Sequence, residues 1–500
     1  MKTILDKIHS YLISNTFIHL LITFGILLYL RQYLLNRSLW LDEAWLSLDI
    51  LKSPSIAAFL HQPLENMQTA PLGFLVIEKV LTSCLGGTEY ILRLFPLFAS
   101  IASLWLFERM SRIYFKDIYV PIAIFTFVSS SSLTYYASEV KPYSIDVFLI
   151  LLSYVYIAPT LLEQLNLQKS MMISLLGAVM LWFSFPVFFV LSGISITVLS
   201  ATIIQKDWVK LPKLGSIFLS WLFSFIICFN VFYIKIIQFQ SSISYWQNGY
   251  PSFINYQSWL IVANNILAYP LGITHFSWCI KLLLPIGAFS FFLEDKKKFF
   301  FLSSPLFLIF LASGLHLYSC KHRLTLFLIP IFLMMIVNGI KTISFKTGKY
   351  RTMTAFLLTG LLFYTSFSSL CANLIHPQGK EEIKLGLSYI KKHLQPNDTI
   401  YVNNGAIPAF MYYKTIFNFS ADHEIKLEGE GSTQNIIEDI RKLDRSKHVW
   451  IILSHVWSFL PDYPSILVSS LLKSNGKLLA TFFDTGINIY LFDLSKLQNS

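Results

Sequence analysis

Residues 11–45 read YLISNTFIHLLITFGILLYLRQYLLNRSLWLDEAW. The stretch Tyr11–Leu30 is predominantly apolar and has the length of about 20 residues that an α-helix needs to cross a bilayer. Lys2 and Lys7 precede it and no small-residue cleavage site follows, so we expect a retained signal anchor with the N-terminus in the cytoplasm. The acidic pair Asp42–Glu43 then lies just beyond the outer end of the first span.

Ten further apolar stretches have a length that predicts a membrane crossing; they lie at roughly 91–110, 118–137, 143–162, 170–185, 188–204, 214–236, 273–293, 299–317, 324–343 and 353–373. With the anchor, they predict an α-helical membrane protein of about eleven transmembrane helices. Residues 71–84 are only 14 long and contain Glu78 and Lys79. We expect a juxtamembrane helix there, on the outer interface, within a long and structured first outer loop at about 35–90.

The composition agrees with a membrane protein. Hydrophobic residues make up 54% of the 500 residues and charged residues 13%, against about 25% in soluble domains. Residues 374–500 carry 13 Lys/Arg and 13 Asp/Glu, so the whole net charge of +11 belongs to residues 1–373. If the spans alternate, much of this charge falls in cytoplasmic loops, as the positive-inside rule requires; these loops are 109–116, 206–213, 296–298 and 341–351. The charge therefore indicates membrane topology and excludes a nucleic-acid partner.

Two domains are expected on this basis. Residues 1–373 form the multi-spanning domain, and residues 374–500 form a soluble domain on the outer side of the membrane. The second domain alternates helical and strand patterns, which is typical of an α/β fold. Helices are predicted at 381–394 and 434–443, and strands at 399–403, 448–454, 477–483 and 487–493.

Ionisable residues near a membrane are costly and by default indicate function. The outer ends of the predicted spans carry several, from separate helices: Asp42, Glu43, Arg93, Glu139, Lys141, Lys321, His322 and Arg323, with Asp146 facing inward. Carboxylates accept a proton or hold a divalent ion, whereas Arg and Lys suit an anionic headgroup such as phosphate. Less specific interpretations stay open: solvated loop charges for Asp42–Glu43, an interfacial ion pair for Glu139 and Lys141, and snorkelling anchors for the two arginines.

The order and spacing of short stretches resemble a known group. The acidic pair follows the first span, and three motifs come after it: QTAPLGFL at 68–75, TEYILRLFP at 88–96 and YASEVKPY at 136–143. This arrangement resembles the GT-C membrane glycosyltransferases, which include the protein O-mannosyltransferases and the aminoarabinose transferase of lipid A. Lys321–Arg323 is similar to a later loop of that group. The group often has Arg where this chain has Lys141, which keeps the charge but not the bidentate fork.

The resemblance implies a GT-C-like fold and a sugar donor linked to a polyprenyl phosphate. It implies inverting transfer to an acceptor hydroxyl on a glycan, lipid or protein at the outer face of the cell membrane. It assigns Asp42 as general base or metal-linked carboxylate, supported by Glu43 and Glu139. It assigns the substrate-binding residues Gln68, Arg93, Lys141, Tyr143, His322 and Arg323. No cofactor is required by the pattern, and a divalent cation at Asp42, Mg²⁺ or Mn²⁺, is left open.

Two other functions are compatible with many spans and a few ionisable groups. A transporter or lipid flippase favours repeated halves and charges near mid-membrane. This sequence shows no repeat, and its ionisable groups gather at one face. A non-catalytic assembly subunit would tolerate neutralisation of the charged residues.

Overall fold

The computed structural model describes residues 10–61, 64–271, 277–375, 379–419, 425–427, 448–455, 463–473 and 476–495. By its internal contacts the chain divides into two compact units. The first consists of Met1–Leu35 and Ser53–Ile375, and the second of Asn36–Lys52 and His376–Ser500. The segment that carries the acidic pair therefore belongs to the same unit as the C-terminal residues.

The described part of the first unit is built from helices. Its first half contains α2 (Asn15–Leu34), η1 (Ile56–Leu60), α4 (Leu72–Leu85), α5 (Glu89–Leu92), α6 (Leu94–Tyr114), α7 (Tyr119–Val128), α8 (Ser131–Tyr136), α9 (Tyr143–Leu152), η2 (Ser153–Ile157), α10 (Ala158–Leu162) and α11 (Leu167–Met180). Its second half contains α12 (Val187–Ile204), α13 (Leu211–Cys228), η3 (Phe229–Tyr233), α14 (Ile234–Ser242), α15 (Ser244–Gln247), α16 (Tyr256–Leu271), α17 (Ser277–Glu294), α18 (Lys296–Gly314), η4 (His322–Leu328), α19 (Ile329–Lys346), η5 (Gly348–Tyr350) and α20 (Arg351–Ile375).

The described residues of the apolar stretches predicted to cross the membrane are mostly helical, but eleven crossings are not confirmed. Among the described residues, six helices are long and apolar enough to span a bilayer, or seven if the bent helix α20 counts as one span. The other predicted spans do not meet this combined criterion of length and composition. The stretch at 118–137, for example, is broken into α7 and α8, because the chain leaves the helix at Ser129–Ser130 and Ser130 caps the second piece.

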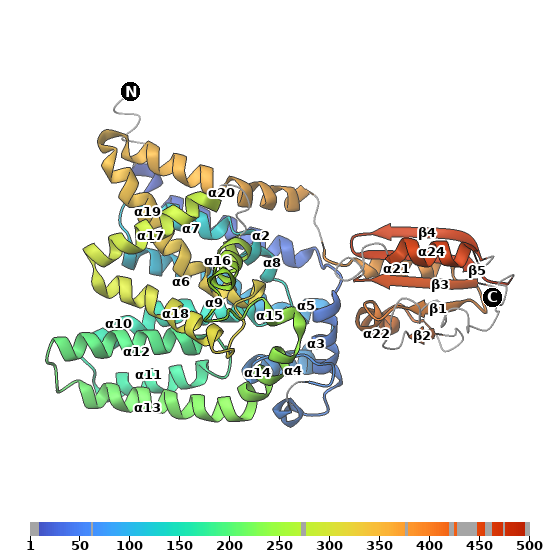
Figure 1. Ribbon diagram of the computed structural model, residues 1–500, viewed down its shortest axis with the longest axis horizontal. Coiled ribbons are helices and arrows are strands. Elements are labelled where there is room, and N and C mark those ends of the chain that lie inside the picture. Colours follow the sequence, from blue (N-terminus) through green and yellow to red (C-terminus); the bar gives the residue numbers. More distant parts are fainter. Residues whose placement is uncertain are drawn as a thin grey trace. The chain divides into compact units, whose positions relative to one another are not determined.

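Helices α17 and α19 of the first unit pack closely side by side (Figure 1). Helix α19 packs against α17, where glycines let the two backbones approach each other. A Cβ added at Gly287 would lie 1.8 Å from the carbonyl oxygen of Met335, and one at Gly339 would lie 2.2 Å from that of Leu283. Asn338 donates a hydrogen bond of 2.9 Å to the Gly287 carbonyl across the same interface. Small residues at such contacts are typical of membrane helices.

The helix expected at 71–84 is present as α4, and its two charged residues differ in environment. Glu78 is buried and Lys79 is half-buried. Neither carboxylate oxygen of Glu78 has a hydrogen-bond partner among the described residues. Burial raises the pKa of Glu78 well above its ordinary value of 4.5. The folded protein therefore favours the protonated carboxyl.

We expect Glu78→Gln to raise the free energy of unfolding of the purified protein at pH 7 by roughly 1–3 kcal/mol, and with it the melting temperature. A carboxyl whose pKa is higher in the folded state favours folding below pH 4.5 and loses that contribution as the pH rises. The gain from glutamine should therefore disappear on acidification towards pH 4.5. The control is Glu163→Gln, an exposed glutamate paired with Lys169, from which no gain is expected. Equal melting temperatures for Glu78→Gln and the unaltered protein at pH 7 would contradict this prediction.

The second unit contains a five-stranded sheet with helices around it (Figure 1). Its described elements are α3 (Leu41–Lys52), α21 (Ile383–His393), β1 (Thr399–Val402), α22 (Ile407–Ile416), β2 (Ile425–Leu427), β3 (His448–Ser454), α24 (Tyr463–Lys473), β4 (Lys477–Asp484) and β5 (Ile487–Asp493). The strand order is β2-β1-β3-β5-β4. Strand β1 is parallel to β2 and β3, whereas β5 is antiparallel to β3 and β4.

Alternating residues of the buried strand β3 pack on two different helices. Val449 and Ile451 belong to a core that includes Leu467 and Leu471 of α24. The ring of Trp450, which points to the opposite face, contacts Tyr389 of α21. This alternation follows from the two-residue period of a strand, and it accounts for the apolar run in β3.

The predicted α/β pattern of the C-terminal residues is confirmed in most of its elements. Helix α21 and strands β1, β3, β4 and β5 lie where the sequence predicts them. Helices α22 and α24 and strand β2 were not predicted. The predicted helix at 434–443 lies outside the described residues.

Candidate active site

The acidic pair occupies the first turn of α3. Carboxylates are favoured there by the positive end of the helix dipole. Successive residues of a helix point in different directions, and here Glu43 is buried with 1% exposure whereas Asp42 is half-buried. Asp42 is therefore the more accessible member of the pair.

The C-terminal residues hold the segment that leads into this helix. The Leu39 N–H donates to the hydroxyl of Tyr413 at 2.9 Å, and the Leu41 N–H donates to Glu381 Oε2 at 3.0 Å. The N–H and hydroxyl of Ser38 both donate to Glu382. Sequence reasoning missed these C-terminal residues, because no local pattern links residues more than 300 positions apart.

Glu139 and Lys141 lie in the turn between α8 and α9, and both are buried. The ammonium of Lys141 donates a hydrogen bond of 2.8 Å to the side-chain oxygen of Gln68. The structure thus brings together two predicted substrate-binding residues that are 73 positions apart. Tyr143, at the start of α9, packs edge-on against Tyr136 at 5.2 Å. The motif at 136–143 therefore forms a fixed, buried turn.

Arg93 joins α5 to α6 and is 1% exposed. A guanidinium that snorkels to the membrane surface would be exposed, so its burial argues against the anchor interpretation. A buried charge needs polar partners, which suits a group that takes part in a polar site.

A basic-aromatic cluster forms where Lys321, His322 and Arg323 meet Tyr245 and Trp246 of α15. The Lys321 ammonium lies 3.7 Å from the centre of the Tyr245 ring, and the Tyr245 hydroxyl is 3.2 Å from His322 Nδ1. The Arg323 guanidinium lies 5.8 Å from the centre of the Trp246 ring. Burial and, secondarily, the Arg323 cation lower the pKa of Lys321.

The sequence explains the cations of this cluster but not its aromatic side. Tyr245 and Trp246 are more than 70 positions away along the chain. In the structure these two rings pack against the side chains of Lys321 and Arg323. Lys321 and Arg323 are two cations held against aromatic rings, an arrangement that suits an anionic group.

The predicted site residues thus fall into groups. Gln68 and Lys141 are in contact, and His322 and Arg323 share the basic-aromatic cluster. Asp42 and Glu43 belong to the second unit, whereas Arg93, Glu139 and Tyr143 belong to the first. The convergence of all these residues on one site stays a prediction.

The described residues form no obvious metal site beside the acidic pair. In the part of the chain that the structure describes, no group of three or more His, Cys, Asp or Glu side chains is placed to hold an ion. A divalent cation at Asp42 therefore stays a prediction from the sequence.

Comparison with known proteins gives no match by sequence: no protein-family model and no curated protein matches the chain. Comparison of structures, in contrast, gives matches. ArnT from Cupriavidus metallidurans in its apo state aligns over 95% of this chain and 98% of its own, with a TM-score of 0.56 and 9% identity. The same protein bound to undecaprenyl phosphate aligns over 96% and 98%, with a TM-score of 0.51 and 10% identity.

An oligosaccharyltransferase from Archaeoglobus fulgidus, crystallised with Zn and sulfate, covers 94% of this chain and 72% of its own length, at a TM-score of 0.48 and 11% identity. The two ArnT alignments extend over nearly the whole of both chains, but their low identity limits the likeness to the fold. The chain therefore has the fold of ArnT, as the resemblance of its sequence to the GT-C membrane glycosyltransferases predicts.

Proposed function

We propose that this protein is an integral-membrane glycosyltransferase. It moves a sugar from a polyprenyl-phosphate donor to an acceptor hydroxyl at the outer face of the cell membrane. The observation that carries the proposal is the fold, which is shared along nearly the entire chain with a protein crystallised bound to undecaprenyl phosphate. The acidic pair and the basic-aromatic cluster supply the two kinds of group that such a transfer needs.

The reaction is a single displacement. The acceptor oxygen forms a bond to the anomeric carbon while the bond from that carbon to the phosphate oxygen breaks, and the configuration inverts. The acceptor proton passes to the carboxylate of Asp42, and the bonding electrons leave with the polyprenyl phosphate. A neutral hydroxyl is a poor nucleophile, so a base that removes its proton as the bond forms lowers the barrier.

Cations serve the departing phosphate. Arg323, with Lys321 and His322 beside it, stabilises the charge that develops on the leaving oxygen. Arg93 and Lys141 contribute positive charge from the two motifs that follow the first outer loop. Glu43 and Glu139 support Asp42, and Gln68 and Tyr143 help to shape the substrate site.

Loss of one sugar from a surface glycan or lipid is the expected result when the gene is deleted. Mass spectrometry of the surface glycans, with and without the gene, tests this and identifies both sugar and acceptor. Complementation with the unaltered gene should restore the sugar. An unchanged set of glycans and lipids would count against the transferase.

We expect the C-terminal residues to lie outside the cytoplasm and the 341–351 loop to lie inside. Cysteines are introduced singly at Lys392 on α21 and at Lys346 at the end of α19, both of which are exposed. The background carries Cys84→Ser, because Cys84 is an exposed native thiol. An impermeant maleimide should label position 392 in intact cells, and position 346 only after permeabilisation. The opposite pattern would overturn this orientation.

A further inference from the structure

The carboxyl ends of the neighbouring strands β1 and β3 have the topology of a ligand site. Strand β1 continues through α22 to β2 on one side of it, whereas β3 continues through α24 to β4 on the other side. The connections therefore diverge between β1 and β3. In open α/β sheets, ligands bind outside the carboxyl ends of the strands at such a switch point.

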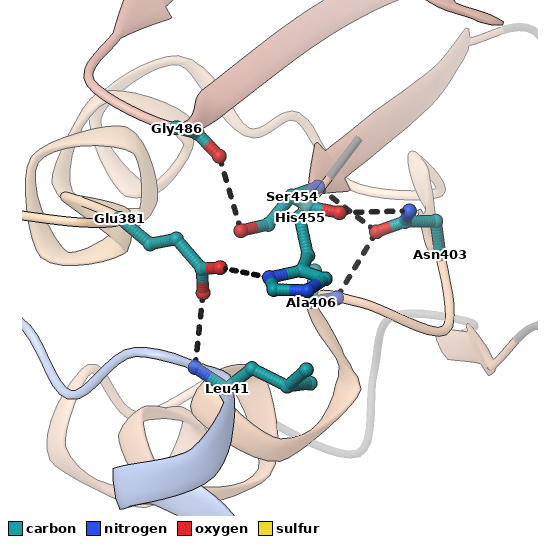
Figure 2. Close-up of polar contacts among 7 residues, drawn as sticks. All are labelled: Leu41, Glu381, Asn403, Ala406, Ser454, His455 and Gly486. Carbon is teal, nitrogen blue, oxygen red and sulfur yellow. Dashed lines mark hydrogen bonds and ion pairs between the residues drawn. The ribbon is translucent and has the colours of Figure 1, made fainter. Parts of the chain in front are cut away.

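The chain's own residues lie against this edge (Figure 2). Glu381 accepts the Leu41 N–H with one carboxylate oxygen, and the other lies 2.7 Å from Nδ1 of His455, the residue that follows β3. The His455 ring stacks on Trp40 at 6.4 Å and an interplanar angle of 27°. The Lys380 ammonium lies 3.6 Å from the centre of the same Trp40 ring. The residues just before Asp42 thus fill the place that a ligand takes in related sheets.

His455 is held in an unusual backbone conformation by its neighbours. Its φ angle is +58°, a left-handed value that is uncommon for a residue with a Cβ. Asn403, which follows β1, fixes the preceding residue: its amide donates to the Ser454 carbonyl at 3.1 Å, and its side-chain oxygen accepts the Ser454 N–H at 3.0 Å. The Ser454 hydroxyl donates to the carbonyl of Gly486 (Figure 2). Such over-determined conformations cluster at functional sites.

We propose that Glu381 and His455 are positioning residues that lock the first turn of α3, and with it Asp42, against the C-terminal sheet. The carboxyl ends of β1 and β3 bind the segment that carries Asp42. The C-terminal sheet therefore takes part in sugar transfer by positioning that residue. The buried Glu381 links α3 to the sheet, because it contacts both the Leu41 amide and the His455 ring. The inference rests on the proposed function for the role of Asp42. The way Glu381 and His455 hold the start of α3 can be measured without an activity assay.

Three variants test the lock. His455→Asn removes the ring and keeps a residue that tolerates the left-handed backbone. Glu381→Ala removes both acceptor oxygens, whereas Glu381→Gln keeps an acceptor for the Leu41 amide. The matched control is His448→Gln, which breaks a second histidine–carboxylate pair of the same sheet, with Asp398 at 3.3 Å, at the amino ends of β1 and β3.

Hydrogen–deuterium exchange of the purified full-length protein is the first measurement. We expect the amides of residues 38–45 to exchange about 10-fold faster or more in His455→Asn and Glu381→Ala. Exchange should be close to normal in Glu381→Gln and unchanged in His448→Gln. Unchanged exchange of residues 38–45 in His455→Asn would contradict the proposal that His455 holds the first turn of α3, even if Glu381→Ala fails to fold.

Modification of surface glycans in cells is the second measurement. We expect His455→Asn to lose most of the transfer and Glu381→Gln to retain it, with normal binding of undecaprenyl phosphate by both purified variants. Fast exchange together with full transfer would overturn the positioning role. If His455→Asn exchanges fast but deletion of the gene changes no glycan, the structural role of Glu381 and His455 stands and the proposed function is contradicted.

Discussion

Asp42→Asn should abolish sugar transfer while leaving expression and membrane insertion intact. Asparagine keeps the size and hydrogen-bonding capacity of the side chain, but it is unable to accept a proton or neutralise a metal ion. Loss of a general base typically removes about 10²–10⁴-fold of rate, far more than the loss of a solvated surface charge. The half-buried position of Asp42 in the first turn of α3 suits this role. The measurement is turnover by the purified variant, or the sugar content of surface glycans in cells that carry it.

Glu43→Gln is the natural comparison, because Glu43 is the adjacent carboxylate but is buried. Its effect should be milder if Glu43 only orients Asp42 or the acceptor, and comparable if both carboxylates hold one ion. Addition of a chelator to the unaltered protein separates these cases. Near-normal turnover by purified Asp42→Asn would remove the mechanism, and with it most of the case for an enzyme.

Arg323→Ala should weaken binding of undecaprenyl phosphate by about 10- to 150-fold, the range that corresponds to one hydrogen bond between charged groups. Arg323→Lys should lose less, since the charge survives and only the bidentate geometry is lost. Binding of undecaprenyl phosphate to the purified protein in nanodiscs measures the effect. Arg93→Ala is expected to act in the same direction, but Arg323 is the cleaner test because Arg93 is fully buried and its removal also disturbs packing.

Arg351→Ala provides the matched control for this experiment. Arg351 also stacks on an aromatic ring, that of Phe345 at 4.7 Å, but it belongs to a loop predicted on the cytoplasmic side. Its removal should leave the affinity unchanged. Full affinity in both Arg323→Ala and Arg93→Ala would mean that these arginines only anchor the chain and that the phosphate binds elsewhere.

Local sequence patterns predicted the secondary structure well where one physical signal dominates. An apolar run long enough to cross a bilayer is helical, since a backbone inside lipid has to satisfy its own hydrogen bonds. Strands β3, β4 and β5 carry enough β-branched and aromatic residues to be found as strands. The number of crossings was less predictable, because breaks such as Ser129–Ser130 divide an apolar stretch without changing its composition.

Side-chain neighbours were the least predictable part of the candidate site. The sequence indicates Lys141 and Gln68 separately, through two motifs, but not that they form a hydrogen bond. It indicates Lys321 and Arg323 as cations but not that Tyr245 and Trp246 hold them. These contacts depend on how helices pack, and the spacing of residues within one helix carries no information about its partner.

The sequence by itself determined that this is a helical membrane protein with a C-terminal α/β region and an acidic pair beyond its first span. Hydrophobic length, charge distribution and strand periodicity are local properties, and each leaves a trace in a short window of residues. Only the tertiary structure decided which residues surround that pair. The hydrogen bond from Leu41 to Glu381 joins positions 340 residues apart, and Trp40 stacks on His455 across a still longer stretch of the chain. Such contacts form because folding brings distant segments to one sheet edge, and no periodic pattern along the chain records them.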